Sequence, residues 1–580
     1  MAFDGIVTRG VASELQELSG ARIDKIFQPS KNNILIGCYL NKKNFLININ
    51  IDSSNYRIHL TTHPKSNPQV APNFCMVLRK HLLGLHIKNV VTNNLERVIT
   101  IEFEGFDEVD DILNKKLIIE LMGKHCNIIL LDEENNIIDS MRHIHQENGF
   151  RNIVPHTKYV YPSTEKQNFL ECSSFDGFSK LVPTTSSLDD LPSVIANLFN
   201  GISQTFIKGA IYELGIDSVN SESLEKLYNY IQTVIYNTDN GKLDFGLLNY
   251  RKDKKDYYIK ISDHVKPAFS LSFFLDDFYY EKESSLEFKI YRDSVLKMIL
   301  DVLNKYKKRL DNMNRKLAEC DDMQKYQLYG ELITANLYRI DNKPVSEISL
   351  ENYYDNNQEI IIKLDSRYSP SINAKRFFKK YNKLKNTLEI VTKQKNDTLK
   401  ELDYIESIVY ELEAASTLDE IYSIFEEISE NVIFSDKTKK LSSKKKDKIK
   451  KSSLTKNKNV SFNPIKYTIG NYQLLVGRNN KENDYLTLKY ASKNDIWFHT
   501  KDIHGSHAIL RLNSNDMPDD DVLIRCAEIA AAHSKAKNSS NVPVDYCEVR
   551  YVKKPNGAKP GMVIYTHNHT LYVNPKVHAS

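Results

Sequence analysis

The densest set of chemically capable side chains surrounds the only tryptophan of the chain. Trp497 and His499 are closely followed by Lys501, His504 and His507. Three histidines at this spacing could hold a metal ion, but a zinc site needs ligands that converge tetrahedrally, and no cysteine lies among them. We therefore expect no metal and no cofactor here. RNA contact by the histidines and Lys501 fits better, with Trp497 either in the core or stacking on a base.

The acid–base pair Glu96-Arg97 is a second candidate, and it directly precedes the β-rich run Val98-Ile99-Thr100-Ile101. A guanidinium can grip a phosphate with two hydrogen bonds or stack on an unpaired base. The carboxylate can accept from base amino groups or orient the arginine. A surface ion pair at the start of a strand is the commoner meaning of such a pair, so both interpretations stay open from the residues alone.

Motifs of the common enzyme classes are absent from the sequence. It contains no Walker A motif, no Gly-x-Ser-x-Gly elbow and no Gly-Gly pair, which excludes a Gly-Gly-Gln loop for peptidyl-tRNA hydrolysis. We expect a binding factor rather than an enzyme.

Length and composition predict a folded, multidomain protein. The chain has 580 residues, and this length is more than one hydrophobic core usually organises. Of these residues, 41% are hydrophobic and 27% are charged, which is ordinary for a folded protein. No stretch approaches the roughly 18 apolar residues of a membrane span, and the first residues lack a basic region followed by an apolar one. We therefore expect a cytoplasmic protein with no membrane partner. Seven scattered cysteines without a Cys-x-x-Cys pair argue against disulfides and a zinc ribbon.

Positive charge is concentrated in one segment. Between Lys437 and Lys458, eleven lysines accompany a single acid, Asp447, so this segment carries +10 and the rest of the chain about −6. Such a run is typical of a solvated linker, which either only tethers its neighbours or also touches phosphates.

Periodicity predicts the elements that must position these residues. Short β-rich runs from Phe3 to Tyr161 predict an α/β domain with helices over 8–18 and 73–83, and residues 190–236 are helical in pattern. Gly201-Ile202-Ser203 and Gly215 fit the turns of a helix-hairpin-helix, although such glycines more often mark only a turn. Strands with one helix over 521–536 predict a second α/β domain at 462–575.

Two apolar series in the middle of the chain predict a long pair of helices. The first steps by four and three through Val295, Ile299, Val302, Tyr306, Leu310, Met313 and Leu317. The second runs through Phe377, Tyr381, Leu384, Leu388, Val391, Leu402, Ile405, Val409 and Leu412. The two series can pair antiparallel within one chain, with residues 341–371 as a knob at the far end. A dimeric coiled coil is the alternative.

Several segments together resemble the family called RqcH in bacteria and NEMF in animals, whose bacterial members once carried the label of fibronectin-binding proteins. The N-terminal likeness lies in Phe3-Asp4-Gly5, Asn94-Leu95-Glu96-Arg97 and the stretch from Glu120 to Leu130. Further likeness lies in 330–338, 369–385, Val476-Gly477-Arg478-Asn479-Asn480, 495–501, Gly505-Ser506-His507 and 553–561. In this order, the segments cover nearly the whole chain.

The resemblance implies a multidomain α+β protein. Its modules are an NFACT-N domain (1–170), a helix-hairpin-helix region with a connection (171–285), a coiled-coil arm with a middle knob (286–435), a Lys-rich linker (436–460) and an NFACT-R RNA-binding domain (461–580). It also implies the task of binding large ribosomal subunits obstructed by peptidyl-tRNA and recruiting charged tRNA, chiefly tRNA-Ala. The stalled chain then receives an mRNA-independent tail that marks it for degradation. As partners the resemblance implies rRNA, ribosomal proteins and both tRNAs, and we expect the protein to act as a monomer on the ribosome.

The resemblance also assigns site residues. It implies tRNA contact by Glu96, Arg97, Glu120, Leu121, Met122 and Lys124. Together with the residue types, it implies RNA contact in the C-terminal domain by Arg478, Trp497, His499, Lys501, Ser506, His507, Lys554 and Lys559.

Two departures from the family pattern stand in this sequence. Glu96 replaces the aspartate of the usual Asp-Arg pair, and His504 replaces the proline before Gly-Ser-His, so the fixed φ of proline is absent. Two other functions stay as alternatives. A fibronectin-binding adhesin rests on the older label alone, and a DNA-glycosylase-like enzyme would need a proline where Ala2 follows Met1.

Overall fold

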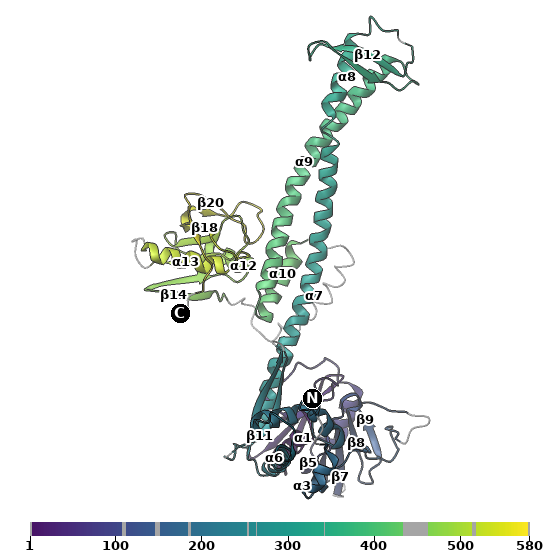
Figure 1. Ribbon diagram of the computed structural model, residues 1–580, viewed down its shortest axis with the longest axis vertical. Coiled ribbons are helices and arrows are strands. Elements are labelled where there is room, and N and C mark those ends of the chain that lie inside the picture. The colour runs from purple at the N-terminus through teal and green to yellow at the C-terminus, as the bar shows by residue number, and fades with distance from the viewer. Residues whose placement is uncertain are drawn as a thin grey trace. The chain divides into compact units, whose positions relative to one another are not determined.

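The computed structural model describes residues 3–106, 112–145, 151–183, 187–251, 254–262, 264–341, 343–432, 462–512 and 518–577. The chain divides into two compact units, Met1–Ser284 and Ser285–Ser580 (Figure 1). The Lys437–Lys458 run, predicted to be a linker, lies outside the described residues.

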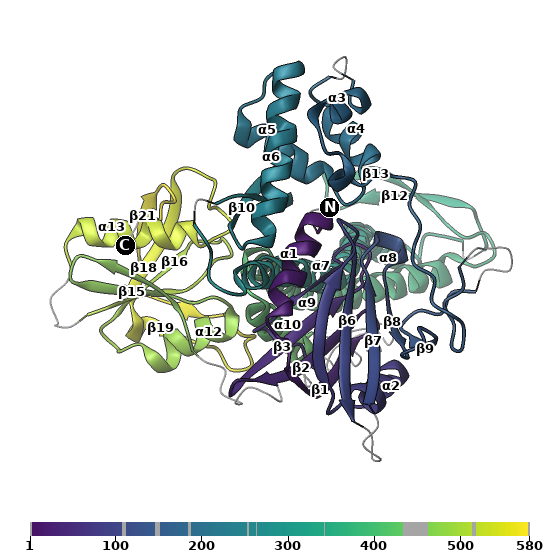
Figure 2. The ribbon, with the colours of Figure 1, turned by 90° about the horizontal axis from the view of Figure 1, so that it is seen from below.

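A nine-stranded antiparallel sheet organises the first unit, in the order β4-β3-β2-β1-β5-β6-β7-β8-β9 (Figure 2). Its strands are β1 (Arg22–Ser30), β2 (Asn33–Leu40), β3 (Lys43–Asn50), β4 (Arg57–Leu60), β5 (His86–Thr92), β6 (Val98–Phe106), β7 (Ile112–Glu120), β8 (Asn127–Leu131) and β9 (Ile137–Ser140). Most neighbours in the sheet are also neighbours in sequence, which allows tight turns. Asn41 and Lys42, with φ of 49° and 62°, form such a two-residue turn between β2 and β3.

Two helices accompany the sheet, as the sequence predicts. Helix α2 (Asn73–Leu82) lies where it was expected. Helix α1 (Gly5–Gln16) buries Val7, Val11 and Leu15, which share one face at a spacing of four residues. It begins earlier than predicted because the Asp4 carboxylate accepts hydrogen bonds from the backbone N–H groups of its first turn.

A helical segment and a hairpin complete the first unit. The elements are α3 (Phe175–Leu181), α4 (Leu191–Leu198), α5 (Gln204–Leu214), α6 (Ser221–Asp239), β10 (Leu243–Arg251) and β11 (Lys254–Ile261). Helix α5 ends at Gly215 with φ of 60°, and an Asn220–Ser223 capping box starts α6. Phe206 of α5 and Ile231 of α6 share one buried core with the sheet, so the segment is packed on it.

The first turns of the long helix α7 (Ser270–Ala318) are fixed within the first unit by polar contacts. The Glu14 carboxylate accepts from the backbone N–H groups of Leu271 and Ser272, both at 2.8 Å. Arg57, which is almost fully buried on β4, pairs with Glu283 at 2.7 Å. These contacts secure the start of α7 to α1 and to the sheet.

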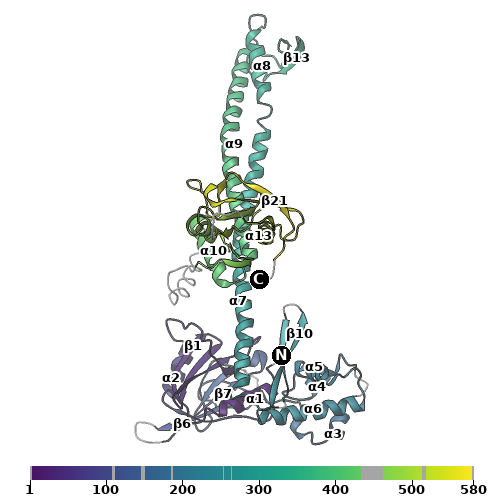
Figure 3. The same cartoon turned by 90° about the vertical axis from the view of Figure 1, so that its left-hand side faces the viewer.

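In the second unit, α7 continues beside α9 (Pro370–Ala414), and the two helices run in opposite directions (Figures 1 and 3). Val295, Ile299 and Val302 of α7 are buried in one cluster with Ile405 and Leu412 of α9. These residues belong to the two predicted apolar series, so the predicted seam is confirmed over this stretch. The same cluster includes the apolar face of α10 (Leu418–Asn431). The seam therefore closes within one chain.

Between the two helices lie α8 (Met323–Ala335) and the hairpin β12 (Glu347–Asn352) and β13 (Gln358–Lys363). Leu350 and Ile362 of the hairpin are buried against Leu332 and Ile333 of α8. A small core of its own thus supports this end of the helix pair, in the stretch expected to form a knob.

The C-terminal domain, residues 462–577, is built on a six-stranded antiparallel sheet in the order β14-β15-β17-β16-β18-β21. Its elements are β14 (Ile465–Ile469), β15 (Tyr472–Val476), α12 (Asn480–Tyr485), β16 (Ile496–Thr500), β17 (Ala508–Arg511), α13 (Asp520–Ala532), β18 (Val542–Glu548), β19 (Val552–Lys553), β20 (Ile564–Tyr565) and β21 (His569–Val573). Cys526 and Ala530 of α13 pack into the sheet core, which confirms the predicted helix. Within the described part of the chain, every helix is too short or too polar to cross a bilayer.

Candidate nucleic-acid interface

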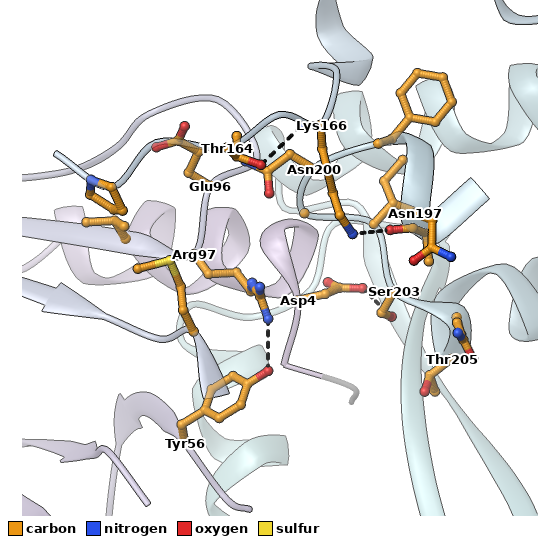
Figure 4. Close-up of a pocket in the computed structure, with 18 of the residues that line it drawn as sticks. Asp4, Tyr56, Glu96, Arg97, Thr164, Lys166, Asn197, Asn200, Ser203 and Thr205 are labelled. Atoms are coloured by element: carbon orange, nitrogen blue, oxygen red, sulfur yellow. Dashed lines mark hydrogen bonds between the residues drawn. The ribbon is translucent and has the colours of Figure 1, made fainter. Parts of the chain in front are cut away.

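A cavity of about 760 Å³ opens in the first unit beside the turn that carries Glu96 and Arg97 (Figure 4). Most of its lining comes from three stretches that are far apart in sequence. They are the turn before β6, the segment 162–166, and the residues from the end of α4 into α5. Its polar lining residues include Asp4, Tyr56, Glu96, Arg97, Lys166, Asn197, Asn200, Ser203, Gln204, Thr205, Lys208 and Asp256.

Arg97 is positioned by both its backbone and its side chain. Its carbonyl accepts from the Leu121 N–H at 2.8 Å, which continues the β6–β7 ladder. Its Nη1 donates to the Tyr56 hydroxyl at 3.1 Å (Figure 4). Because a guanidinium has five N–H donors, the bond to Tyr56 leaves other donors that can point into the cavity.

Two further groups give the cavity its electrostatic character. Glu96 Oε2 is buried and has no hydrogen-bond partner among the described residues. Lys166 donates to the Ala196 carbonyl at 2.5 Å. The pKa of Lys166 is lowered, mainly because it is partly buried and also because the Arg97 cation lies nearby. The cavity therefore combines an acceptor with two neighbouring cations, which suits a ligand that has both donors and negative charge.

The far wall is held against the Glu96-Arg97 turn by close backbone packing. The Ser203 hydroxyl caps α5 and donates to Asp4 Oδ2 at 2.6 Å. Gly201 has φ of 74°, and a Cβ at this position would come within 1.8 Å of the Leu95 carbonyl oxygen. Only glycine allows the loop to approach so closely. The turn and the helical segment thus form one site.

Two residues predicted to meet tRNA are buried instead. Glu120 ends β7, has no exposed surface, and pairs with Arg151 and with the Tyr159 hydroxyl at 2.8 Å. Leu121 is also fully buried, because its N–H continues the ladder and its side chain enters the core. The prediction that these side chains lie open to a ligand is wrong. Met122 lines the cavity, and Lys124 is exposed on the following turn.

Replacing Glu120 with glutamine should weaken the sheet rather than abolish ligand binding. The change removes the charge from a buried hydrogen-bonded pair, so we expect the opening free energy of β7 and β8 to fall by about 1–2 kcal/mol. Amide hydrogen exchange of these strands measures it. Lys124→Gln, at an exposed neighbour, should leave exchange unchanged. Loss of tRNA binding without a change in exchange would instead show that Glu120 contacts the ligand.

The histidine cluster of the C-terminal domain is also largely internal. Trp497 has no exposed surface and His507 is 2% exposed, so the structure places Trp497 in the core. Burial lowers the pKa of His507 to about 3 and that of the half-buried His499 to about 4. Both rings are therefore neutral near pH 7, and their predicted RNA contact stays a prediction for uncharged imidazoles. Lys501 is exposed and Ser506 is half-buried.

The three remaining predicted residues of this domain point into ion pairs and hydrogen bonds. Arg478 pairs with Glu420 of α10 at 2.7 Å, and Lys554 pairs with Asp484 within the domain. Lys559 donates to the Asn431 carbonyl at 2.7 Å. Among the described residues, no three His, Cys, Asp or Glu side chains gather where they could hold a metal ion.

Sequence reasoning missed several residues that the fold brings to Arg97. Tyr56, Lys166 and Gln204 line the same cavity. Tyr56 directly precedes β4, Lys166 lies in a loop, and Gln204 is the first residue of α5. No local motif marks them. The one available signal was Gly201-Ile202-Ser203, which predicted a turn but not its contact with the Leu95 backbone.

Comparisons with known proteins agree with this architecture. A model of the NFACT N-terminal and middle domains matches residues 4–448, and a model of the NFACT protein RNA binding domain matches residues 458–566. The Rqc2 homolog RqcH of Bacillus subtilis (strain 168) is 35% identical, over 99% of this chain and 98% of its own length. The Rqc2 homolog RqcH of Streptococcus suis (strain 05ZYH33) is 32% identical over the same shares.

A solved structure of the fibrinogen binding protein from Staphylococcus aureus is 27% identical and covers 48% of this chain and 99% of its own, with a TM-score of 0.41. Two family models and full-length relatives above 30% identity establish the relationship. The chain belongs to the RqcH family of NFACT-domain proteins, and its C-terminal domain is an NFACT RNA-binding domain.

Proposed function

We propose that this protein is a ribosome quality-control factor that binds large ribosomal subunits obstructed by peptidyl-tRNA. It recruits charged tRNA, with tRNA-Ala as the expected species, so that the stalled chain receives a C-terminal tail without mRNA and is marked for degradation. Membership of the RqcH family and the RNA-binding domain support the general role. The ribosome, rather than this chain, would form the peptide bonds.

The observation that carries the tRNA assignment is the cavity beside Glu96 and Arg97. Its volume lies within the roughly 300–1,000 Å³ typical of sites that enclose a small ligand, so it can accept an unstacked nucleotide. Arg97 and Lys166 would meet the phosphate or a base edge, and Glu96 would accept from a base amino group. An unpaired loop such as the anticodon loop offers nucleotides in this state.

The helical elements fit supporting roles in this proposal. Helices α5 and α6, with the turn at Gly215, would act as a helix-hairpin-helix against the tRNA backbone. The α7–α9 pair would act as a coiled-coil arm, since the 45 residues of α9 extend over roughly 70 Å. The hairpin β12–β13 would reach a distant site on the subunit. Because the seam closes within one chain, a monomer suffices.

The exposed aromatic residues of that hairpin give a test of its reach. Tyr353 and Tyr354 are 49% and 65% exposed in the turn between β12 and β13. Replacing both with serine should weaken association with large subunits roughly tenfold, as expected for anchor residues of an interface. Sedimentation with purified subunits measures it. Ile390→Ser, at an exposed position in α9, is the matched control, and equal binding by both variants would contradict the reaching role.

A reconstituted tailing reaction tests the proposed function as a whole. Large subunits that carry a peptidyl-tRNA are mixed with the protein, charged tRNA-Ala and no mRNA. The nascent chain should gain alanines only when the protein is present. Tails that form equally well without it would overturn the proposal.

A further inference from the structure

One face of the C-terminal domain packs against α9 and α10 within the second unit. Arg478 Nη1 donates to Glu420 Oε1 at 2.7 Å, and Lys559 Nζ donates to the Asn431 carbonyl at 2.7 Å. Three further sets of charged groups meet across this face: Lys481 with Glu430 and Glu426 at 3.0 and 3.8 Å, Lys559 with Glu401 at 3.5 Å, and His504 with Asp403 at 3.6 Å. We call these residues of the C-terminal domain the docked face.

The two sides of the docked contact carry opposite charges. In each ion pair of Arg478, Lys481 and Lys559 across this contact, the cation belongs to the C-terminal domain and the carboxylate belongs to α9 or α10. The His504 ring faces Asp403 of α9 in the same direction. Arginine and lysine bind carboxylate and phosphate oxygens by the same charge-assisted hydrogen bonds. The helices therefore present to this domain the kind of anionic oxygen that an RNA backbone presents.

The centre of the contact contains two buried carboxyl groups. Glu427 accepts from the Tyr404 hydroxyl at 2.9 Å and from Asn480 Nδ2 at 3.2 Å, and Glu411 accepts from the Asn480 backbone N–H. Each has a buried Oε2 with no hydrogen-bond partner among the described residues. Burial raises the pKa of both groups, and the pair of like charges raises that of Glu411 further. Burying such groups opposes docking, so the contact is held mainly by its rim.

The docked face also carries the residues that the family resemblance assigned to RNA. Arg478 and Lys559 belong to two of the four segments of the domain that the sequence singled out, and both turn toward the helices rather than toward solvent. Trp497 and His507, from the other two segments, are in the core, whereas Lys501 is exposed. Two of the segments that could contact RNA are therefore covered by α9 and α10.

We propose that the docked face is the RNA-binding face of the C-terminal domain, and that the carboxylates of α9 and α10 occupy it in place of RNA phosphates. RNA and the helix pair then compete for Arg478, Lys481 and Lys559. The inference rests on the RNA-binding class of this domain and not on the tRNA cavity of the first unit. In the absence of RNA, the docked state masks the domain, and RNA releases it.

Variants of the carboxylates on α10 and α9 distinguish competition for the docked face from a general effect of removing negative charge. Glu420→Gln, Glu426→Gln and Glu430→Gln together remove the rim carboxylates of α10, and glutamine at 420 preserves the capping box with Thr417. This triple variant should bind a short unstructured RNA roughly tenfold more tightly. The charge-matched control is Glu389→Gln with Asp397→Asn and Glu413→Gln, three exposed positions of α9. It should bind RNA like the parent.

Two opposite changes complete the design. Glu411→Gln replaces a carboxyl group whose ionised form burial and Glu427 disfavour, so docking should tighten and RNA affinity should fall severalfold. Arg478→Gln, Lys481→Gln and Lys559→Gln together should reduce the slope of log affinity against log salt by about 2, since each lost single-strand phosphate contact contributes about 0.7. Each measurement is made in the parent and in an Arg97→Ala background, which removes the contribution of the cavity. Fluorescence of the buried Trp497 confirms that the domain is folded.

The outcomes decide the proposal. Two results together support the proposal. The slope of log RNA affinity against log salt falls in the Arg478, Lys481 and Lys559 variant, and RNA affinity rises in the α10 variant but not in its charge-matched control. An unchanged slope would place RNA on another face, such as the exposed cations Lys489, Lys493 and Arg550. Equal affinities for the α10 variant and its charge-matched control would show that docking and RNA binding do not compete. Either of these results overturns the inference while leaving the tRNA cavity untouched.

Discussion

Arg97→Ala is expected to lower the affinity for tRNA roughly ten- to hundredfold while association with the large subunit persists. The substitution removes a charge-assisted contact of about 1.5–3 kcal/mol, which corresponds to that change in affinity. Subunit binding should persist because the helix pair and the C-terminal domain supply separate surfaces. The paired measurement is the amount of tRNA recovered per bound large subunit and the length of the tail on a stalled chain.

Neighbouring substitutions sharpen this prediction. Tyr56→Phe removes only the hydroxyl that accepts from Arg97, so it should cost a severalfold loss that is smaller than that of Arg97→Ala. Glu96→Asp restores the acid usual in the family and should be nearly neutral, whereas Glu96→Lys should disorganise the site. If a folded Arg97→Ala protein retains both tRNA and tail length, the assignment of this site is wrong.

The C-terminal domain is expected to lose about 3 kcal/mol of unfolding free energy between pH 6.5 and pH 5. Burial holds the pKa of His507 at about 3 and that of His499 at about 4, below the ordinary value of 6.5. Below pH 6.5 these two histidines therefore become protonated in the unfolded chain but stay neutral in the folded domain. The stabilisation is complete well above pH 6.5 and is lost as pH falls, and the loss approaches about 1.4 kcal/mol per pH unit for each ring at lower pH.

Urea unfolding followed by Trp497 fluorescence measures this loss in the intact chain. Trp497 is the only tryptophan and is buried against both histidine rings, with ring centroids 5.6 and 5.4 Å away, so its emission reports this domain alone. His499→Gln with His507→Gln should flatten the pH dependence whatever its effect on stability at pH 7. If this double variant keeps the slope of the parent, other groups carry the titration and the two histidines do not.

Much of the fold was predictable because periodicity reports which face of an element is buried. The steps of four and three through Val295, Ile299 and Val302 specified a helix with one apolar stripe, and this stripe is the observed seam with α9. The run from Val98 to Ile101 likewise specified β6. The start of α1 was misplaced because Asp4 caps it through contacts that an apolar pattern does not record.

The candidate site was less predictable, because its composition depends on tertiary contacts. Residue type at Glu120 suggested an exposed acid, and the partner that buries it, Arg151, lies beyond a turn and two further strands. Arg478 and Lys559 were predicted to be RNA-binding cations, but no local pattern predicts that Glu420 of α10 and Glu401 of α9 face them. The Glu96-Arg97 turn was found from sequence, while the wall built by Gly201 and Ser203 required the fold.

Sequencing the RNA that co-purifies with large subunits bound to the intact chain tests the central claim most directly. The proposed function predicts that tRNA is enriched over its share of total cellular tRNA, with tRNA-Ala foremost. It also predicts that this enrichment disappears in Arg97→Ala, whereas the recovery of rRNA is unchanged. Large subunits recovered without any enriched tRNA, or tRNA enrichment that is equal in the two proteins, would contradict it.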